Sequence, residues 1–353
     1  MAKDFSANIQ KTVVSLVKDL APRNRDIISR RFGLKNGKKE TLESIGRNYS
    51  ITRERVRQIE EFTLKQLSKL ADVNTDVASY ISWARDFVEA REGVVKEKDL
   101  FKAFSGQEGD SSANASLLFL LSINASLVRT LESNEFNSFW SSSAQRSDSF
   151  NNTVSTLVKT LEKSRNVVSA DNFYSFAKEN SIPSFNNSEL AKSHIDACLS
   201  VSKLVNKNIF NEIGLVSWPE VKPRGVKDKA YLVLKRSNSP KHFGEIAELI
   251  NETGFSNKKA NVQTVHNELI KDNRFVLVGR GMYALSEWGY SSGTVKDVLV
   301  NILKKSQKPL ARASLVAKVM DARMVKENTI LLNLQDSKTF SKKEDGTYTL
   351  RKA

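Results

Sequence analysis

Residues 20–70 read LAPRNRDIISRRFGLKNGKKETLESIGRNYSITRERVRQIEEFTLKQLSKL, and this stretch decides the fold of the N-terminal part of the chain. Apolar residues recur near its start at Ile27, Ile28 and Phe32, and their spacing predicts a first helix. Gly33 follows directly and is typical of a helix C-terminus, where a left-handed residue is needed. The stretch therefore opens with a helix and a turn.

The second half of the stretch predicts two more helices. Thr41 is placed to cap a short helix, and Thr52 is placed to cap a third helix that starts at Arg53. In the third helix Val56 and Ile59 return to one side, so the intervening polar residues face outward. A short helix, a tight turn and a helix with a polar first turn are typical of a helix-turn-helix.

The outward face of the third helix carries side chains that can read DNA bases. In the major groove Arg53 can pair with guanine, Glu54 can accept from cytosine, and Gln58 can pair with adenine. The same residues would also make an ordinary solvated helix face with internal ion pairs. By themselves the five outward residues leave both interpretations open; they are Arg53, Glu54, Arg55, Arg57 and Gln58.

Three motifs in fixed order add a family resemblance. RRFGL (30–34), TLESIG (41–46) and TRERVRQIE (52–60) resemble region 4 of the primary sigma-factor family of bacterial RNA polymerase. This resemblance covers about 50 residues, one seventh of the chain. It implies a domain that reads the −35 promoter element and packs on the β-flap of the polymerase.

The resemblance also implies roles for individual residues. Matched position by position, Arg53, Glu54 and Gln58 contact bases, and a second group contacts the DNA backbone or adjacent base edges, as phosphate contacts set the register. That second group is Thr52, Arg55 and Arg57, with Arg31 on the backbone. Nothing upstream of residue 20 resembles the segments that melt the −10 element, so we expect something other than a complete sigma factor.

The rest of the chain indicates a repeated module. Loops are expected at 105–116, 141–152 and 219–225, where Ser, Gly, Asn or Pro dominate. Copies of a helix–helix–helix–hairpin pattern start near 83, 154, 226 and 295, a spacing of about 70 residues. The predicted fold class is mainly α, an N-terminal helix-turn-helix followed by tandem winged-helix-like domains with short β-hairpins. The expected domains are 1–75, 80–140 (degenerate), 153–218 (with Gly214 near its hairpin turn), 226–290 and 294–353.

Residues 226–290 resemble a second family, the HARE-type winged helix-turn-helix. The matching segments are PKHF (240–243), IAELI (246–250) and the closing DNRF…GRGMY (272–283). Basic residues around this hairpin suit a track of phosphates, since cations on one face bind nucleic acid. They are Lys258, Lys259, Lys271, Arg274 and Arg280. An adaptor fold with an incidental basic surface is the alternative.

The distribution of charge favours polyanionic partners. The 353 residues carry a net charge of +15, with 16 Lys or Arg against 8 Asp or Glu in residues 1–70 and 25 against 13 in residues 221–353. The middle, 71–220, has 14 against 19 and is mildly acidic. Two separate basic ends therefore predict two surfaces that face DNA or another polyanion.

The sequence contains no recognisable pattern of a catalytic or metal site, so we do not expect an enzyme. Glu220-Val221-Lys222 has the spacing of half a nuclease core, but it falls in a proline-bounded linker without a partner aspartate. Cys198 and His194 are four residues apart with no acidic partner, and His242 and His266 have no metal-ligand spacing. We expect no cofactor, no metal, no small-molecule ligand and no membrane contact, in a cytoplasmic, nucleoid-associated protein.

The sequence therefore predicts a DNA-binding transcription factor. Its expected partners are double-stranded DNA of a −35-like promoter type and bacterial RNA polymerase through the β-flap. One alternative is a polymerase-bound adaptor that resembles the delta subunit and reads no sequence. Another is the DNA-recognition component of a restriction or defence system.

Overall fold

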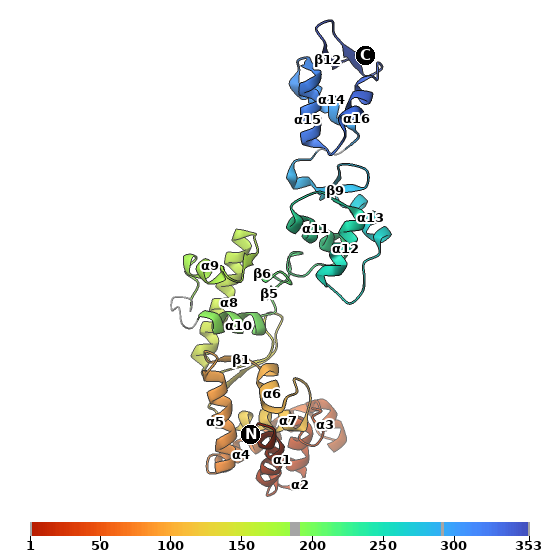
Figure 1. Ribbon diagram of the computed structural model, residues 1–353. Helices are drawn as coiled ribbons and strands as arrows, with labels where there is room; N and C mark the ends of the chain where they lie inside the picture. Colours follow the sequence, from red (N-terminus) through yellow and green to blue (C-terminus); the bar gives the residue numbers. More distant parts are fainter. Residues whose placement is uncertain (1, 184–190, 291–292, 352–353) are drawn as a thin grey trace. The chain divides into compact units, whose positions relative to one another are not determined.

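The computed structural model describes residues 2–183, 191–290 and 293–351 and is mainly helical with small antiparallel sheets (Figure 1). This confirms the predicted fold class. The chain divides into two compact units, 1–217 and 218–353, each of which is described by itself. None of the helices in the described ranges combines the length and apolar character that crossing a bilayer requires.

The N-terminal helix-turn-helix has its predicted cap residues at Gly33, Thr41 and Thr52, whereas Tyr49, expected in the turn, ends the second helix. It consists of α2 (Pro22–Phe32), α3 (Leu42–Tyr49) and α4 (Arg53–Ala71). Gly33 ends α2 in the left-handed region, with φ of 73°, where an L side chain is strained. Thr41 and Thr52 cap α3 and α4, since each hydroxyl accepts a hydrogen bond from a backbone N–H three residues later, at 3.1 Å.

The three helices enclose a small core of their own. Ile27, Ile45 and Val56, one from each helix, are fully buried against one another. Each fully buried aliphatic side chain contributes about 1.5–3 kcal/mol from removal of its surface from water. This core sets the angle between α3 and α4 and so the direction in which the start of α4 projects.

A larger core joins the helix-turn-helix to the segment that follows it. The helix α1 (Ala2–Val17), α2 and α4 share this core with α5 (Thr75–Glu89), α6 (Glu97–Ser105) and α7 (Ser112–Ile123). The helix α7 packs on α1, α2 and α4, and Leu117, Phe119 and Leu120 of α7 are fully buried. Residues 1–75 and 80–140, which were expected to be separate domains, therefore share one hydrophobic core.

Beyond α4 the described elements repeat one order four times: helix, strand, helix, helix, strand, strand. Module 1 (75–141) comprises α5, β1 (Val94–Lys96), α6, α7, β2 (Val128–Thr130) and β3 (Phe139–Ser141). Module 2 (144–215) comprises α8 (Ala144–Ser164), β4 (Val168–Ser169), α9 (Phe173–Glu179), α10 (Ala191–Val201), β5 (Val205–Lys207) and β6 (Glu212–Leu215).

The second unit contains the other two copies. Module 3 (226–285) comprises α11 (Val226–Ser237), β7 (Lys241–His242), α12 (Phe243–Thr253), α13 (Val262–Lys271), β8 (Phe275–Leu277) and β9 (Met282–Leu285), and a 3-10 turn, η1 (Ser286–Trp288), follows. Module 4 (295–350) comprises α14 (Val295–Ser306), β10 (Leu310–Ala311), α15 (Arg312–Ala322), α16 (Glu327–Leu334), β11 (Phe340–Lys342) and β12 (Thr347–Leu350).

All four sheets have the same topology. In each described three-stranded sheet the last strand of the module lies in the centre, hydrogen-bonded to both others: β1-β3-β2, β4-β6-β5, β7-β9-β8 and β10-β12-β11. We call the last two strands of each module and their connection its wing. The third helix of each module is α7, α10, α13 or α16. The fold thus repeats one helix-and-wing unit.

Two expectations about loops were wrong. Residues 141–152 were expected to be a loop, but α8 begins at Ala144 and is capped by the Ser143 hydroxyl. Its first two turns are mostly polar, but Phe150 is 1% exposed and anchors the helix in a core that modules 1 and 2 share. Likewise only 106–111 of the expected loop 105–116 is irregular, because Ser111 caps α7. Serine-rich composition hid both helix starts.

The wing turn of module 2 also differs from expectation. Gly214 was expected near the turn, but it lies inside β6 and pairs with Asn206. The turn is formed by Asn208 and Asn211, and Asn211 adopts a φ of 63°. The Asn208 side chain accepts hydrogen bonds from the backbone N–H groups of Phe210 and Glu212 at 2.9 and 3.0 Å, which closes the turn.

Candidate nucleic-acid interface

The first two turns of α4 present a row of exposed polar side chains. Its buried side is made by Val56, Thr63 and Leu67, each 0% exposed, at seven- and four-residue intervals. Helical periodicity therefore turns the remaining residues outward. The exposed residues of these turns are Arg53, Glu54, Arg55, Arg57 and Gln58. The structure brings together every residue of the 52–58 set.

A tight turn fixes the orientation of this row. Ser50 adopts the left-handed region with φ of 52°, and the Ile51 N–H donates to the Gly46 carbonyl at 3.0 Å. A Cβ at Gly46 would lie 2.7 Å from the Ile51 carbonyl oxygen, so only glycine allows α3 and the turn to approach this closely. The sequence contained this feature in TLESIG, but its reason is visible only in three dimensions.

Several of these exposed side chains pair with one another. The Arg57 guanidinium contacts the Glu54 carboxylate at 2.7 Å and also pairs with Glu61. The Arg55 guanidinium donates to the Gln58 side-chain oxygen at 3.1 Å. The hydrogen bond from Arg57 holds the pKa of Glu54 below its usual value. Because exposed ion pairs are weak, these side chains can give up their contacts with one another and bind bases and phosphates instead at little cost in free energy.

Arg31 has two protein partners. Its Nε atom contacts the Glu60 carboxylate at 3.1 Å, and its Nη1 atom donates to the Glu40 carbonyl at 3.2 Å. Its side chain is 33% exposed and that of Glu60 only 16%. Arg31 therefore ties α2 to α4. The predicted backbone contact stays a prediction, in which only the exposed part of the guanidinium would face DNA.

Four of the five basic residues predicted in module 3 are exposed. Lys258 and Lys259 lie in the connection between α12 and α13, Lys271 ends α13, and Arg280 lies in the wing turn. They lie on the connection, helix and wing of one module. The track of phosphates that they were expected to bind stays a prediction.

Arg274 differs from these four residues. Its Nη2 atom contacts Asp272 at 2.7 Å and Asp228 at 2.8 Å, and the Asp228 side chain is only 7% exposed. Two carboxylates thus compensate its charge, and Arg274 joins α11 to the start of β8. The structure shows a packing role for Arg274, and Asp228, its partner 46 residues away, was not identified from the sequence.

The exposed face of α13 carries a row of polar residues that was not predicted from the sequence. Asn261 caps the helix, and Gln263, Thr264 and Asn267 are exposed. The Gln263 amide donates to the Asn267 side-chain oxygen at 3.3 Å. Amide side chains can pair with adenine in the major groove. The spacing of Gln263 and Asn267, one helical turn apart, was a signal that could have found them.

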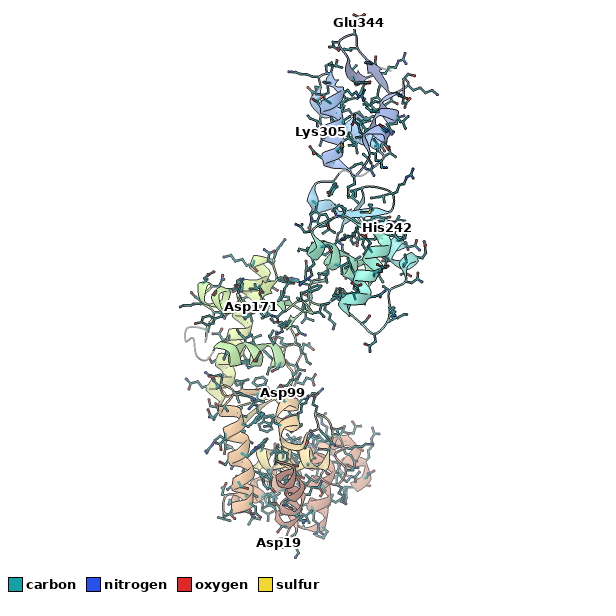
Figure 2. The ribbon with its side chains drawn as sticks, viewed as in Figure 1. Asp19, Asp99, Asp171, His242, Lys305 and Glu344 are labelled. Atoms are coloured by element: carbon teal, nitrogen blue, oxygen red, sulfur yellow. The ribbon has the colours of Figure 1, made fainter. Side chains whose placement is uncertain are left out.

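Cys198 and the three histidines contribute to packing and to helix capping. Burial raises the pKa of the Cys198 thiol to about 12 and lowers the pKa of His194 to about 4, so at neutral pH neither is charged. His242 lies at the start of α12 and accepts a hydrogen bond from the Gly244 N–H at 3.2 Å (Figure 2). The His266 ring stacks on Phe243 at a centroid distance of 4.4 Å. A thiolate, which nucleophilic attack requires, is disfavoured at Cys198.

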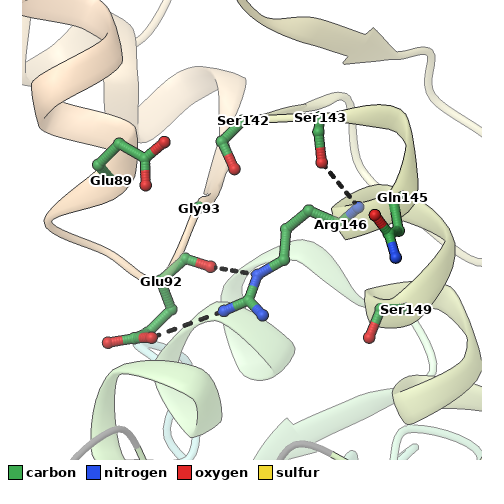
Figure 3. Close-up of a pocket in the computed structure, with 8 residues that line it drawn as sticks. All are labelled: Glu89, Glu92, Gly93, Ser142, Ser143, Gln145, Arg146 and Ser149. Atoms are coloured by element: carbon green, nitrogen blue, oxygen red, sulfur yellow. Dashed lines mark hydrogen bonds and ion pairs between the residues drawn. The ribbon is translucent and has the colours of Figure 1, made fainter.

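A polar pocket lies where α5 ends and α8 begins (Figure 3). It has a volume of about 440 Å³, and Glu92 and Arg146 face each other in it. The Arg146 Nε atom donates to the Glu92 carbonyl at 2.7 Å, and its Nη2 atom lies 3.6 Å from the Glu92 carboxylate. The contact between Glu92 and Arg146 joins modules 1 and 2. Because the Glu92 carboxylate compensates the charge of Arg146, the pocket offers little attraction for a phosphate.

Comparisons with known proteins find relatives for the N-terminal segment. The family model Sigma-70, region 4 matches residues 16–69. RNA polymerase sigma factor SigA of Nostoc sp. is 41% identical over 59 residues, which is 17% of this chain and 15% of that protein. SigA of Synechocystis sp. is 43% identical over 65 residues (18% and 15%), and principal sigma factor HrdD of Streptomyces coelicolor is 45% identical over 56 residues (16% and 17%).

The chain thus covers about one sixth of the length of these relatives. The matched segment contains α2, α3 and nearly all of α4, so it includes the whole exposed row of residues 52–58. The match indicates a sigma-factor-like role in DNA binding and transcription for this segment.

Proposed function

We propose that this protein is a sequence-specific DNA-binding transcription factor that reads promoter-type, −35-like DNA with α4 and acts with bacterial RNA polymerase. The observation that carries the proposal is the exposed row of Arg53, Glu54, Arg57 and Gln58 at the start of α4, the capped last helix of the helix-turn-helix. The match of this segment to Sigma-70, region 4 supports it.

The chemistry of the row fits base recognition. Arg53 offers a two-pronged donor for the O6 and N7 atoms of guanine, Glu54 accepts from the cytosine amino group, and Gln58 pairs with adenine. Thr52, Arg55 and Arg57 flank them and contact phosphates or adjacent base edges, which sets the register of α4 in the groove. The chain itself performs no catalytic step in this proposal.

Modules 3 and 4 hold flanking DNA in the proposal. Residues 221–353 carry 25 Lys or Arg against 13 Asp or Glu, so this part of the chain attracts a polyanion over a long range. Lys258, Lys259, Lys271 and Arg280 supply phosphate contacts, and the amides of α13 lie on the same module. Phosphate contacts of this kind make affinity depend steeply on salt.

A polymerase-bound adaptor without base readout is the second candidate, and one groove favours it. Between α1 and α2 lies a groove of about 570 Å³. Its lining includes apolar residues such as Val13, Val14 and Val17, the basic residues Lys18, Arg25 and Lys35, and Asp26. An apolar helix with acidic neighbours would fit there. We favour the DNA-reading function because α7 already covers the apolar face that α2 and α4 share, and that face is therefore closed to a partner protein.

Selection from a randomised duplex pool tests the proposal. The full chain and the Arg53→Ala variant are incubated with the pool at two salt concentrations, and bound DNA is sequenced. Arg47→Ala is the matched control, since Arg47 is 77% exposed on α3 and, among the described residues, its guanidinium pairs with Glu43 of the same helix. We expect a −35-like hexamer that persists at the higher salt concentration, is weakened by Arg53→Ala and is retained in Arg47→Ala.

Binding that is weak, steeply salt-dependent and without an enriched motif would contradict base readout. Co-purification with RNA polymerase in that case would support the adaptor instead.

A further inference from the structure

The wings of modules 1 and 3 contact the module that follows each of them. In the first unit the connection between β2 and β3 meets the end of α10: the Asn137 N–H donates to the Val201 carbonyl at 2.8 Å, and the Lys203 N–H donates to the Glu135 carbonyl at 2.7 Å. Phe136 and Ser202 form an isolated bridge between these hydrogen bonds. The wing of module 1 is thus a docking element for module 2.

The second unit uses its first wing in the same way. The end of β8 and the wing turn of module 3 meet the connection between α15 and α16 of module 4. The Met324 N–H donates to the Val278 carbonyl at 3.1 Å, and the Arg323 Nη2 atom donates to the Leu277 carbonyl at 2.6 Å. Val278 is fully buried, and a Cβ at Gly279 would lie 3.1 Å from the Met324 carbonyl oxygen, so the two segments are in close contact.

Arg323 is the unusual member of this contact. It is 6% exposed, and within the described residues its Nε and Nη1 atoms have no hydrogen-bond partner. Burial lowers its pKa below the usual arginine value. The nearby Asp297 carboxylate attracts this cation, but burial has the larger effect on its pKa. A buried cation with a single hydrogen bond costs free energy of desolvation that such interactions only partly offset. The contact is therefore better explained by the geometry that it imposes than by the stability that it adds.

We propose that Arg323 is a positioning residue that fixes module 4 on the wing of module 3 and thereby holds the wing turn that carries Arg280. The turn is short: only Val278 to Gly281 separate β8 from β9, and the Val278 N–H bonds to the Met282 carbonyl at 2.9 Å. We call the hydrogen bonds from Arg323 and Met324 to the Leu277 and Val278 carbonyls the clamp. The clamp acts directly on the residues where the turn begins. Modules 3 and 4 then move as one body.

The consequence for DNA rests on the proposed function, whereas the clamp itself does not. Arg280 is exposed at the tip of the turn, so its reach toward a phosphate depends on how the turn is held. Module 4 thus contributes to DNA binding by module 3 through Arg323, in addition to any contact of its own.

Hydrogen exchange at single-amide resolution on the full chain tests the clamp. Arg323→Met replaces the guanidinium by an apolar side chain that can fill much of its volume, a change that is often neutral or stabilising for a buried charge. We expect the Met324 N–H to exchange about tenfold faster in Arg323→Met, because its hydrogen bond to Val278 opens locally. Arg323→Lys, which keeps one donor for the Leu277 carbonyl, is expected to restore most of the protection.

The control is Arg312→Ala in the same module. Arg312 is 57% exposed and pairs with Glu327 at 3.6 Å, so its loss removes a similar cation without touching the clamp. Amides inside α14, such as that of Leu303, report on the fold of module 4. Unchanged protection at Met324 in Arg323→Met would overturn the proposal. Equal loss at Met324 and Leu303 would also overturn it, since Arg323 would then serve stability of the whole module.

A measurement of DNA binding by single and double variants separates this inference from the proposed function. If both hold, Arg323→Met weakens DNA binding in the normal chain but has no further effect in the Arg280→Ala background, because contacting groups are not additive. An additive effect would contradict the link from Arg323 to Arg280. If the chain binds no DNA in either background, the proposed function fails while the exchange result still decides the clamp.

Discussion

The ring of Phe119 packs edge-on against the ring of Phe32, with centroids 5.2 Å apart and planes at 72°. Phe32 ends α2 inside the segment that matches Sigma-70, region 4, whereas Phe119 belongs to α7, about 50 residues beyond its end. The core of the helix-turn-helix segment is therefore completed by the third helix of module 1. In module 1 the third helix, α7, is buried against the helix-turn-helix.

Loss of the Phe119 ring should therefore destabilise α4 as well as α7. Phe119→Ala removes a fully buried aromatic side chain and is expected to cost about 3–5 kcal/mol of unfolding free energy. Urea unfolding measures the loss, and hydrogen exchange of α4 amides shows whether it reaches the DNA-reading helix. Leu131→Ala, at a side chain that is 66% exposed, should change stability by less than about 0.5 kcal/mol. Unchanged exchange in α4 would contradict the shared core.

Glu54 should control base preference more than affinity. In Glu54→Ala the acceptor for cytosine is lost, so discrimination at one base pair should fall by about 1–3 kcal/mol. Binding to the selected site and to each single-base variant measures it. Arg57 loses its partner Glu54 in this variant, and total affinity for unrelated DNA should stay equal or rise because a negative charge is removed. Equal losses on all sequences would show that Glu54 has no reading role.

Arg280 should act on all DNA alike. In Arg280→Ala one phosphate contact is lost, and the slope of log affinity against log salt should become shallower by about 1. Titrations at several salt concentrations with the selected site and with a scrambled duplex measure this. Lys163→Ala, at the exposed end of α8, is the control and should leave the slope unchanged. A loss confined to the selected site would contradict the assignment.

Arg274 should affect stability, with a defined dependence on pH. Arg274→Ala leaves the nearly buried Asp228 without its cation and is expected to cost about 1–3 kcal/mol. Arg274 also holds the pKa of Asp272 below its usual value. That carboxylate therefore stabilises the fold above the ordinary Asp pKa of about 4, and the contribution is lost as pH falls below it.

Urea midpoints at pH 7 and pH 3 test this sign. The midpoint of the normal chain should fall more between the two pH values than that of Arg274→Ala, because the variant has already lost the interaction. A wider fall in the variant would contradict the assignment.

The sequence predicted the helix-turn-helix closely because its signals are local. Gly33, Thr41 and Thr52 each act on backbone groups within four residues, and side-chain periodicity sets the buried face of α4. The same locality explains why the exposed set of residues 52–58 could be named. Their pairing, in which Arg57 joins Glu54 and Glu61, follows from helical spacing and was anticipated as the solvated-face alternative.

What the sequence missed depends on contacts between distant residues. The partners of Arg274 include Asp228, 46 residues away, and the burial of Phe150 that anchors α8 is invisible in a polar segment. The clamp at Arg323 joins two modules through backbone carbonyls, which carry no residue identity. Neither periodicity nor composition reports such contacts.

The shared core also determines when the N-terminal segment can finish folding during synthesis. The ribosome completes α4 at Ala71 but does not complete α7 until Ile123, which at ordinary rates of translation is about 3–10 s later. During that interval Phe32 and Leu67 have no α7 to cover them, although the polar face of α4 is already made. The nascent chain is therefore most exposed to aggregation, and most accessible to chaperones, just before the first module is finished.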